Sequence, residues 1–403
     1  MVDVLGDVWQ VERMERFDVG VVGAGFAGLC AATLLGRAGH RVTLYERASE
    51  PGPVGAAIVL QPSGLAVLEA MGLADGVIAG GARLDGLRVR TRKGRVVLEL
   101  DYGLDARWFG LGVSRGAIFT ALFAAAREVA TIRTGCEVLE VVARGRPVLR
   151  GAGAEGVHDL VVVADGARSR LAEVMGGRTV VPYPWGALWF VGAWEGATER
   201  LEQVCDGARR FVGVLPMGER RASLFWSLKA ADLGAWRGRF EAWREEVVGL
   251  APMARPLVEQ IERDEQVLFA PYFDVRMKRW SRPGVVVIGD AAHATSPQLG
   301  QGTNLALVDA WMLARVIAEN GIGGVGRYNK LRKRQLAYYQ RATRWLTPFF
   351  QSDSLVLGWM RDIGFPMMRL MPAVKRLMMS SMAGVASGFL GRREPLVCDW
   401  PRA

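Results

Sequence analysis

The order of apolar runs and Gly-rich turns near the start of the chain predicts a strand–helix–strand unit. Residues 17–22 form an apolar run that is followed by a turn with three glycines. Residues 29–35 are mostly apolar and are predicted to belong to the helix after this turn. Another apolar run covers residues 42–45 and ends at Glu46. Residues 17–47 are therefore predicted to form a βαβ unit.

The rest of the pattern predicts a mixed α/β protein with a separate antiparallel sheet. Alternating and aromatic residues over 181–230 favour antiparallel strands, and five apolar or Gly residues at 285–289 favour a buried strand. The other predicted elements are a helix over 58–80 that ends near Gly72, a hairpin over 84–100, a helix over 114–129 with Ser114 as its N-cap, strands within 137–164, a helical region over 233–262 and a helix over 303–319.

The first turn carries a nucleotide-binding pattern. Gly23 permits the tight turn, Gly25 lets the backbone approach a pyrophosphate, and Gly28 lets the helix pack close to the strand. The helix N-terminus then attracts phosphates with its free N–H groups and dipole. Glu46 follows about 20 residues on, where a carboxylate accepts ribose hydroxyls and disfavours a 2′-phosphate. The candidate phosphate-binding residues are Gly23, Ala24, Gly25, Phe26, Ala27 and Gly28.

Two later segments narrow the predicted nucleotide to FAD. Each is an apolar run that ends in a Gly and an Asp, at 160–166 and at 285–293, and the second continues to a Gly-rich segment at 300–304. No second complete dinucleotide fingerprint occurs, so a nicotinamide reductant would lack a Rossmann domain of its own. The candidate residues are Asp165, Gly166, Gly289, Asp290, His293, Gly302, Thr303 and Asn304.

Composition excludes several other classes of protein. The 403 residues, half of them hydrophobic, are enough for two domains with substantial cores. The four cysteines show no paired spacing, which disfavours a disulfide framework or zinc site and favours a reducing cytoplasm. The first residues lack the basic and then apolar pattern of a secretory signal peptide, and they are expected to form a loose extension. Outside the dinucleotide motif no uncharged apolar run reaches about 18 residues, so no spanning helix is expected.

The positive charge of the chain is concentrated in its last fifth. Residues 323–403 contain 14 Lys/Arg and 4 Asp/Glu, a balance equal to the net charge of +10 of the whole chain. A predicted basic helix at 327–345 is followed by a Met-rich and aromatic tail. This tail is expected either to pack as a helical layer on the core or to lie on an anionic membrane surface. No nucleic-acid-binding module is recognisable, so nucleic acid is not expected as a partner.

These motifs resemble those of the class A FAD-dependent monooxygenases, the p-hydroxybenzoate hydroxylase-like family that includes ubiquinone-pathway hydroxylases. The resemblance covers residues 17 to about 320 and is most specific over 289–310. It implies an α/β fold in which a Rossmann-like FAD-binding domain is interleaved with an antiparallel β-sheet substrate domain and followed by C-terminal helices. The FAD-binding domain would comprise 17–84, 107–180 and 271–345, the substrate domain 85–106 and 181–270, and the C-terminal helical segment 346–403.

The resemblance also implies roles for single residues near the adenosine and the nicotinamide. Glu46 would hold the adenosine ribose with Arg47 beside it, and Arg115 would contact the flavin side. Asp165 and Gly166 would serve FAD and the nicotinamide cofactor together.

Further roles concern the flavin ring. Asp290 would accept a hydrogen bond from a ribityl hydroxyl, and the helix start at 302–304 would face the pyrimidine end of the isoalloxazine, where its dipole stabilises negative charge. Pro297 would shape the loop over the flavin. His293 is either a general base or a structural residue of the third motif.

The sequence departs from the family pattern at two places that concern the reductant. An Arg that the family often has is absent from residues 51–55, and Gln61 is a candidate to replace part of its function. Ala172 stands where the second motif of the family has another Arg, and Arg168 or Arg170 is a candidate to serve instead.

The resemblance implies an FAD-dependent monooxygenase that consumes NADH or NADPH and inserts one oxygen atom from O₂ through a flavin C4a-hydroperoxide, by hydroxylation or epoxidation. The aromatic composition of 181–270 favours an apolar aromatic, quinone-like or polyketide/isoprenoid substrate. The candidate substrate-contacting residues, each of which could equally belong to the core, are Tyr183, Trp189, Trp226 and Tyr272.

Two alternative functions stay open at this point. One is a flavin-dependent halogenase or isoprenoid reductase, although residues 189–194 do not match the W-x-W-x-I-P motif of the halogenases. The other is a non-catalytic FAD-fold carrier of a lipophilic ligand, which the basic apolar tail motivates. The protein is expected to be a cytoplasmic monomer or homodimer, with the tail on a membrane as the alternative location.

Overall fold

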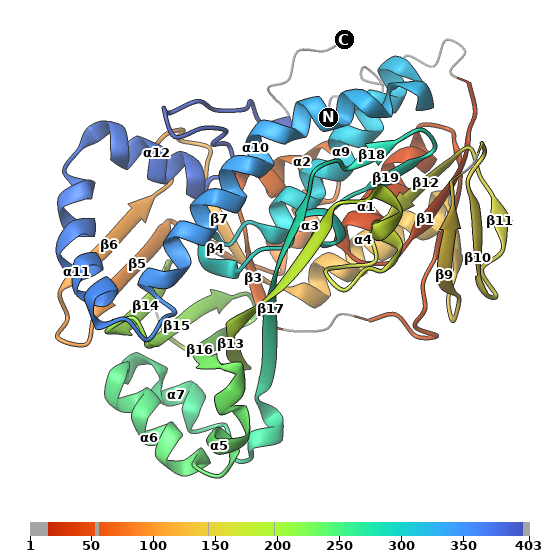
Figure 1. The fold of residues 1–403 in the computed structure, drawn as a ribbon. Helices are drawn as coiled ribbons and strands as arrows, with labels where there is room; N and C mark the ends of the chain where they lie inside the picture. The colour runs from red at the N-terminus through yellow and green to blue at the C-terminus, as the bar shows by residue number, and fades with distance from the viewer. Residues whose placement is uncertain (1–14, 53–55, 144, 197, 398–403) are drawn as a thin grey trace.

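The computed structural model describes residues 15–52, 56–143, 145–196 and 198–397, which form two large sheets, two small ones and a C-terminal helical layer (Figure 1). The expected α/β class with several sheets is confirmed. The predicted N-terminal extension up to residue 14, residues 53–55 of the segment 51–55, and Cys398 lie outside the described residues.

A six-stranded sheet with the order β18-β19-β12-β1-β2-β8 carries the predicted nucleotide motifs. Its strands from β19 to β8 run parallel, and β18 is antiparallel to β19. Helix α1 packs against both α4 and α9, so these helices cover the central strands. The elements are β1 (Asp18–Val22), α1 (Phe26–Arg37), β2 (Arg41–Tyr45), α4 (Arg115–Val129), β8 (Thr131–Arg133), β12 (Leu160–Val163), β18 (Ser281–Arg282), β19 (Val285–Val287), α8 (Asp290–His293) and α9 (Gly302–Asn320).

A seven-stranded sheet with the order β17-β13-β16-β15-β14-β5-β6 forms the second layer. It is antiparallel except where β14 pairs with β5 in parallel, a pairing that joins residues far apart in sequence. The domain boundaries themselves stay a prediction. The strands are β5 (Gly86–Thr91), β6 (Val96–Asp101), β13 (Arg178–Ala193), β14 (Arg200–Asp206), β15 (Arg210–Met217), β16 (Arg221–Lys229) and β17 (Leu268–Met277).

Helices cover both faces of this second sheet. One apolar cluster joins the sheet to the predicted helical region, which folds as α5 (Leu233–Arg237), α6 (Phe240–Leu250) and α7 (Arg255–Val258) below the sheet in Figure 1. Another cluster joins strands β5 and β6 to α11 (Leu355–Arg369) and α12 (Pro372–Met382), at the left of the same view. The second sheet therefore has one face toward α5–α7 and one toward the C-terminal helices.

The prediction of a helix over 58–80 that ends near Gly72 is confirmed at that end, where α2 stops at Ala70, but is wrong at its start. Residues 57–60 are strand β3, which pairs with β7 in a small sheet and leaves the helical part to begin at Pro62. Proline suits the first turn of a helix because its missing N–H has no helical partner there. The chain breaks again at Gly72, whose φ is +69°, and resumes as a separate helix. The elements are β3 (Ala57–Leu60), α2 (Pro62–Ala70), α3 (Ala74–Ala79), β4 (Ala82–Leu84) and β7 (Gly110–Ser114).

Other predicted elements are confirmed with small changes in their ends. Ser114 caps α4 by accepting a hydrogen bond from the backbone N–H of Ala117 at 3.0 Å. The strands predicted within 137–164 include the second small sheet, which consists of β9 (Glu137–Val142), β10 (Val148–Ala152) and β11 (Gly156–Val157). The predicted basic helix is α10 (Val325–Leu346), which buries Tyr328 and Tyr339 against the core. Among the described residues, no helix is both long and apolar enough to cross a membrane.

Arg361 fixes helix α11 to the second sheet. Its side chain is fully buried and donates hydrogen bonds to the carbonyl oxygens of Gly207 and Phe349, each at 2.9 Å, and to the carboxylate of Asp362. The guanidinium also lies 5.2 Å from the centre of the Phe350 ring.

An Arg361→Met substitution should therefore lower the free energy of unfolding by about 2–3 kcal/mol, because two buried carbonyls lose a charged donor. Chemical denaturation of the purified variant measures this loss. Arg376→Met is the control, since Arg376 is exposed on α12 and should change stability little. Equal stability of the two variants would contradict this anchoring role.

Candidate functional site

The three predicted nucleotide motifs meet at one edge of the six-stranded sheet. Val22 at the end of β1 pairs with Tyr45 at the end of β2 and with Val163 at the end of β12. Val163 in turn pairs with Val287 at the end of β19. The segments that follow these strands therefore begin side by side, at the carboxyl ends where open parallel sheets bind ligands.

The first turn can be built only with glycine at two positions. Gly23 has a φ of +101°, and a Cβ there would lie 2.6 Å from the carbonyl oxygen of Ala164. A Cβ on Gly28 would lie 1.9 Å from the carbonyl oxygen of Gly23. Gly25 is different, because it is exposed and a Cβ would meet nothing closer than 4.0 Å. The turn is therefore tightly packed on its inner side and open at Gly25, where helix α1 starts without a side-chain cap.

Glu46 is held against this turn by backbone donors. Its two carboxylate oxygens accept hydrogen bonds from the N–H groups of Ala24 at 2.7 Å and Ala48 at 2.9 Å. Each oxygen keeps a free lone pair, so the carboxylate can also accept from a ribose. Arg47, the next residue, is exposed.

Asp165 presents a buried oxygen that has no partner among the described residues. Its Oδ1 atom is inaccessible and makes no hydrogen bond. Burial raises the pKa of Asp165, while a hydrogen bond from Ser169 and the charges of Arg178 and Arg47 act in the opposite direction. An unsatisfied buried acceptor at the mouth of a nucleotide-binding turn is what a ligand hydroxyl or ordered water would satisfy.

Arg178 is a residue that sequence reasoning missed. It donates to the carbonyl oxygens of Ser169 at 2.7 Å, Ala167 at 2.6 Å and Ala291 at 3.2 Å, and so ties the second motif to the third. Arg168 and Arg170, the residues proposed from the sequence, are both exposed. No local pattern marked Arg178, because its partners are backbone carbonyls in distant segments.

The third motif brings a charged pair beside helix α1. Gly289 has a φ of +61°, and a Cβ there would lie 2.8 Å from the Cβ of Ala27. Asp290 follows and is exposed, and Arg115 at the start of α4 lies with its guanidinium 5.0 Å from the Phe26 ring centre. Burial lowers the pKa of Arg115, and the charge of Asp290 opposes that shift. The first motif, the third motif and α4 thus form one wall of charged and aromatic groups.

His293 belongs to a buried ion-pair network. Its Nε2 is hydrogen-bonded to the carboxylate of Asp309, which also accepts from Arg332 at 2.7 Å and from the backbone N–H of Gly289 at 3.0 Å. Burial alone would raise the pKa of Asp309, but His293, Arg332 and the Gly289 hydrogen bond together hold it well below its usual range. These contacts favour the structural interpretation of His293 over the general-base interpretation.

Asn304 is also occupied by structural hydrogen bonds. Its amide accepts from the N–H of Gln61 at 2.9 Å and donates to the carbonyls of Val59 and Gly300 at 3.2 and 3.0 Å. The open groups at the start of α9 are therefore the backbone N–H groups near Gly302, the exposed first residue of this helix, whose N-terminus has no side-chain cap. The predicted dipole at 302–304 can act on a ligand through these N–H groups.

An aromatic row crosses one face of the second sheet. We define it as Trp189, Phe225, Phe211, Phe350 and Phe365. Successive ring centres are separated by 5.3, 5.3, 5.0 and 6.0 Å. The row belongs to the sheet face that packs on Tyr102, whose hydroxyl donates to Gln61 at 2.5 Å.

The four candidate substrate residues do not share one surface. Trp189 pairs across strands with Phe225, whereas Trp226 pairs with Leu188, so the two tryptophans point to opposite faces. Trp226 is 4% exposed and packs with Trp236 under α5–α7, which is a core position. The prediction of a substrate contact for Trp226 is corrected accordingly.

The two candidate tyrosines are half-buried on the side of Trp189. Burial raises the pKa of Tyr272, and a hydrogen bond with Trp189 opposes the shift. Burial likewise raises the pKa of Tyr183, the charge of Asp274 adds to the shift, and a hydrogen bond with Ser296 opposes it. Ser296 precedes the exposed Pro297, and its hydroxyl bonds to that of Thr347 at 2.6 Å. Tyr183 therefore borders the loop that was predicted to cover the flavin, and Tyr272 borders Trp189.

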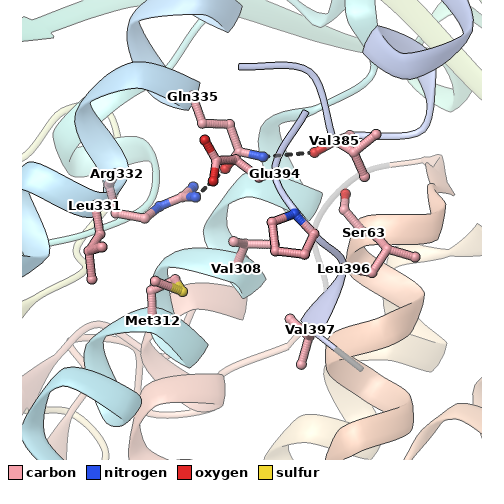
Figure 2. A pocket seen from close by; sticks show the side chains of 12 residues that line it. Ser63, Val308, Met312, Leu331, Arg332, Gln335, Val385, Glu394, Leu396 and Val397 are labelled. Atoms are coloured by element: carbon pink, nitrogen blue, oxygen red, sulfur yellow. Dashed lines mark hydrogen bonds between the residues drawn. The ribbon is translucent and has the colours of Figure 1, made fainter. Parts of the chain in front are cut away.

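A small cavity elsewhere in the structure belongs to the support of α9. It is lined by α9, α10 and residues 384–397, and Figure 2 shows Arg332 and Gln335 pointing toward one another at its edge. No group of His, Cys, Asp and Glu side chains that could hold a metal ion occurs among the described residues.

Comparisons with known proteins place the chain in a family. A family model described as an FAD-binding domain matches residues 16–340. The 6-methylpretetramide 4-monooxygenase of Streptomyces rimosus is 32% identical over 75% of this chain and 75% of the relative. The 2-heptyl-3-hydroxy-4(1H)-quinolone synthase of Pseudomonas aeruginosa is 29% identical over 73% of this chain and 79% of the relative.

Solved structures show the same fold. A variant of 2-methyl-3-hydroxypyridine-5-carboxylic acid oxygenase superposes with a TM-score of 0.76 at 22% identity, covering 93% of this chain and 99% of that one. The Pseudomonas aeruginosa protein PqsL in complex with 2-aminobenzoylacetate gives a TM-score of 0.75 at 24% identity, covering 85% of this chain and 99% of that one.

The relatives named as monooxygenases exclude a non-catalytic carrier and disfavour the halogenase and reductase alternatives. The chain therefore belongs to the FAD-binding-domain family and is an FAD-dependent monooxygenase.

Proposed function

We propose that this monooxygenase consumes NADH or NADPH and inserts one oxygen atom from O₂ into an apolar aromatic substrate of the quinone or polyketide type. The observation that carries the proposal is the half-buried ring pair of Trp189 and Phe225 at one end of the aromatic row, on the face of the second sheet opposite to Trp226, which offers ring faces in place of charged groups. Flat apolar rings stack favourably on such side chains. Two of the relatives, named for a pretetramide and a heptylquinolone, support the same class of substrate.

The residues at the sheet edge would bind the two ends of FAD differently. The open turn at Gly25 would take the pyrophosphate, and Glu46 the adenosine ribose. Asp290 would accept from the ribityl chain, and the uncapped start of α9 would donate to the flavin ring. When bound, FAD supplies the electron transfer and oxygen activation. The unsatisfied oxygen of Asp165 would accept from a ligand hydroxyl in the same cleft.

The protein groups around the ring then orient the substrate and exclude water. Trp189 and the half-buried Tyr272 would hold an apolar ring beside the flavin, and Pro297 would shape the covering loop. A dry pocket limits the side reaction that releases H₂O₂. Hydroxylation and epoxidation both require this placement.

The proposal is tested by the absorbance spectrum of the purified protein and by its oxidation of NADH and NADPH. We expect a flavin spectrum, and nicotinamide oxidation that lipophilic quinones or polycyclic phenols stimulate with an oxygenated product. A protein with bound FAD that consumes neither nicotinamide with any such compound would contradict the proposed reductant. Stimulation only by small carboxylated aromatics would contradict the proposed substrate class.

Glu46→Gln should weaken FAD binding by about tenfold, because one of two acceptors facing the ribose becomes a donor. The affinity is measured by titrating FAD into the apoprotein and monitoring the quenching of flavin fluorescence. Glu50→Gln is the matched control, since Glu50 is an exposed carboxylate four residues further on. An affinity loss shared by both variants would point to net charge instead of a ribose contact.

His293→Asn should lower stability by about 2–3 kcal/mol, because the buried carboxylate of Asp309 loses a hydrogen-bond partner. The pH profile of kcat, corrected for bound flavin, should keep its shape. Denaturation curves and steady-state kinetics over a range of pH measure the two effects. A general base contributes about 10²–10⁴ in rate, so a stable variant with a loss of that size would restore the catalytic interpretation.

Trp189→Leu and Trp226→Leu form a matched pair on adjacent strands with opposite orientations. We expect Trp189→Leu to lower kcat/KM for the aromatic substrate by about tenfold, because it loses a stacking surface. Trp226→Leu should instead lower stability by about 2–4 kcal/mol and leave kcat/KM of the folded enzyme unchanged. The reverse pattern would assign the substrate to the other face of the sheet.

A further inference from the structure

Helix α11 and the two residues that follow it, which lead into α12, expose a set of large apolar side chains. The side chains of Leu355, Trp359, Met367 and Leu370 are 84, 66, 63 and 78% exposed. We call this set the α11–α12 stripe, and its members are Leu355, Val356, Trp359, Met360, Ile363, Met367, Leu370 and Met371. An exposed apolar patch of this kind on a folded protein marks an interaction surface.

The stripe is held outward by the opposite face of α11. Gly358 lies so close to the sheet that a Cβ there would be 2.8 Å from the backbone nitrogen of Ala208. Arg361 is anchored by its carbonyl partners, and Phe365 is buried in the aromatic row. Because these three residues fix the rotation of the helix, the stripe cannot turn inward without breaking buried contacts.

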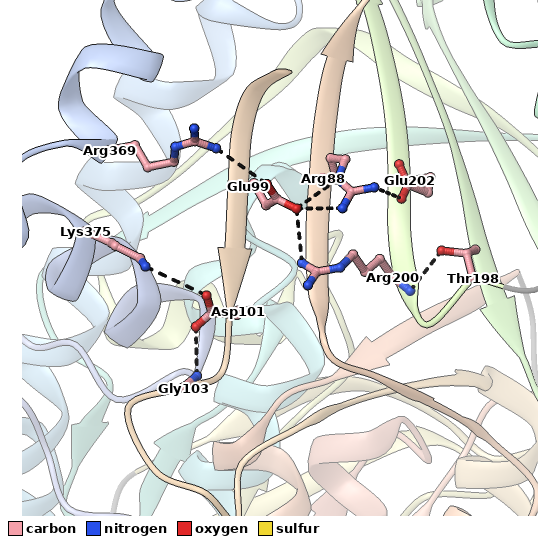
Figure 3. A network of polar contacts seen from close by, with 9 residues as sticks. All are labelled: Arg88, Glu99, Asp101, Gly103, Thr198, Arg200, Glu202, Arg369 and Lys375. Carbon is pink, nitrogen blue, oxygen red and sulfur yellow. Dashed lines mark hydrogen bonds and ion pairs between the residues drawn. The ribbon is translucent and has the colours of Figure 1, made fainter. Parts of the chain in front are cut away.

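The charges of α11 and α12 lie beside the stripe and leave its centre neutral. Arg361 is paired with Asp362, and Figure 3 shows Arg369 and Lys375 reaching strand β6, where they lie 3.5 Å from Glu99 and 3.9 Å from Asp101. Arg376 is exposed and forms no ion pair with the residues that the structure describes. The helices therefore carry apolar side chains at the centre and cations at the C-terminal end.

The positive charge of the C-terminal region indicates which kind of surface could cover the stripe. Residues 323–403 carry the entire net charge of +10 of the chain, and the exposed side of α10 includes Lys330, Lys333, Arg334 and Arg341. Two copies joined through this region would bring like charges together, which disfavours association. An anionic surface would attract the same charges.

We propose that the α11–α12 stripe docks the protein on an anionic lipid surface. The apolar side chains would lie below the headgroups and the flanking cations among them, so that α11 lies in the plane of the interface. Since α11 also contributes Phe365 to the aromatic row, docking would place that row next to the lipid. The binding itself depends only on the stripe and the charges, and so it can be tested apart from the reaction.

The test is co-sedimentation of the FAD-loaded enzyme with vesicles of phosphatidylcholine alone and of phosphatidylcholine mixed equally with phosphatidylglycerol. We expect binding to the anionic vesicles that is at least about tenfold tighter and that weakens as salt is added. Trp359→Glu combined with Met367→Glu should reduce that binding by about tenfold or more, with the flavin spectrum and melting temperature unchanged, since both positions are exposed.

Leu139→Glu is the matched control, because Leu139 is 61% exposed on β9, in another sheet. An equal loss of vesicle binding by Leu139→Glu and by the stripe variant would overturn the proposal. So would a wild-type enzyme that binds neither vesicle. A wild-type dimer in sedimentation velocity that the stripe variant dissociates would assign the surface to a second copy of the chain and likewise overturn lipid docking.

Discussion

The close approach of backbone segments at the carboxyl edge of the six-stranded sheet is the constraint on which the site depends. Gly23 lies against Ala164, Gly28 against Gly23, and Gly289 against Ala27, at separations that leave no room for a Cβ. These contacts bring three segments from distant parts of the sequence within reach of one ligand. A side chain at any of these positions would separate the segments and open the nucleotide cleft.

The same edge is supported from behind by buried charge. Asp309 joins the Gly289 backbone, His293 and Arg332, so helix α9 and the third motif are fixed to α10. Arg178 performs the corresponding task for the second motif through three carbonyls. These networks occupy many of the polar side chains at the sheet edge. The site therefore offers a ligand backbone N–H groups at helix ends more than free side chains.

The parts of the fold that follow local rules could be predicted from the sequence, and the parts that depend on distant partners could not. The turn at 23–28 and the N-cap at Ser114 are local, and both were found. Strand β3 has the apolar pattern of a buried helix and becomes a strand only because β7 pairs with it. Likewise, alternation showed that Trp189 and Trp226 belong to strands, but only the pairing register shows that they face opposite sides.

The C-terminal region shows how one sequence signal can be compatible with two structural interpretations. A basic, apolar tail predicts either a packed helical layer or an interfacial surface, and these were treated as alternatives. Helix α10 follows the first, since Tyr328 and Tyr339 are buried. In α11 the inner face is packed through Gly358 and Arg361 while the outer face stays apolar and exposed. Because a helix has two faces, packing on the core and docking on lipid do not exclude one another, and the residues that anchor α11 are those that keep its outer face available.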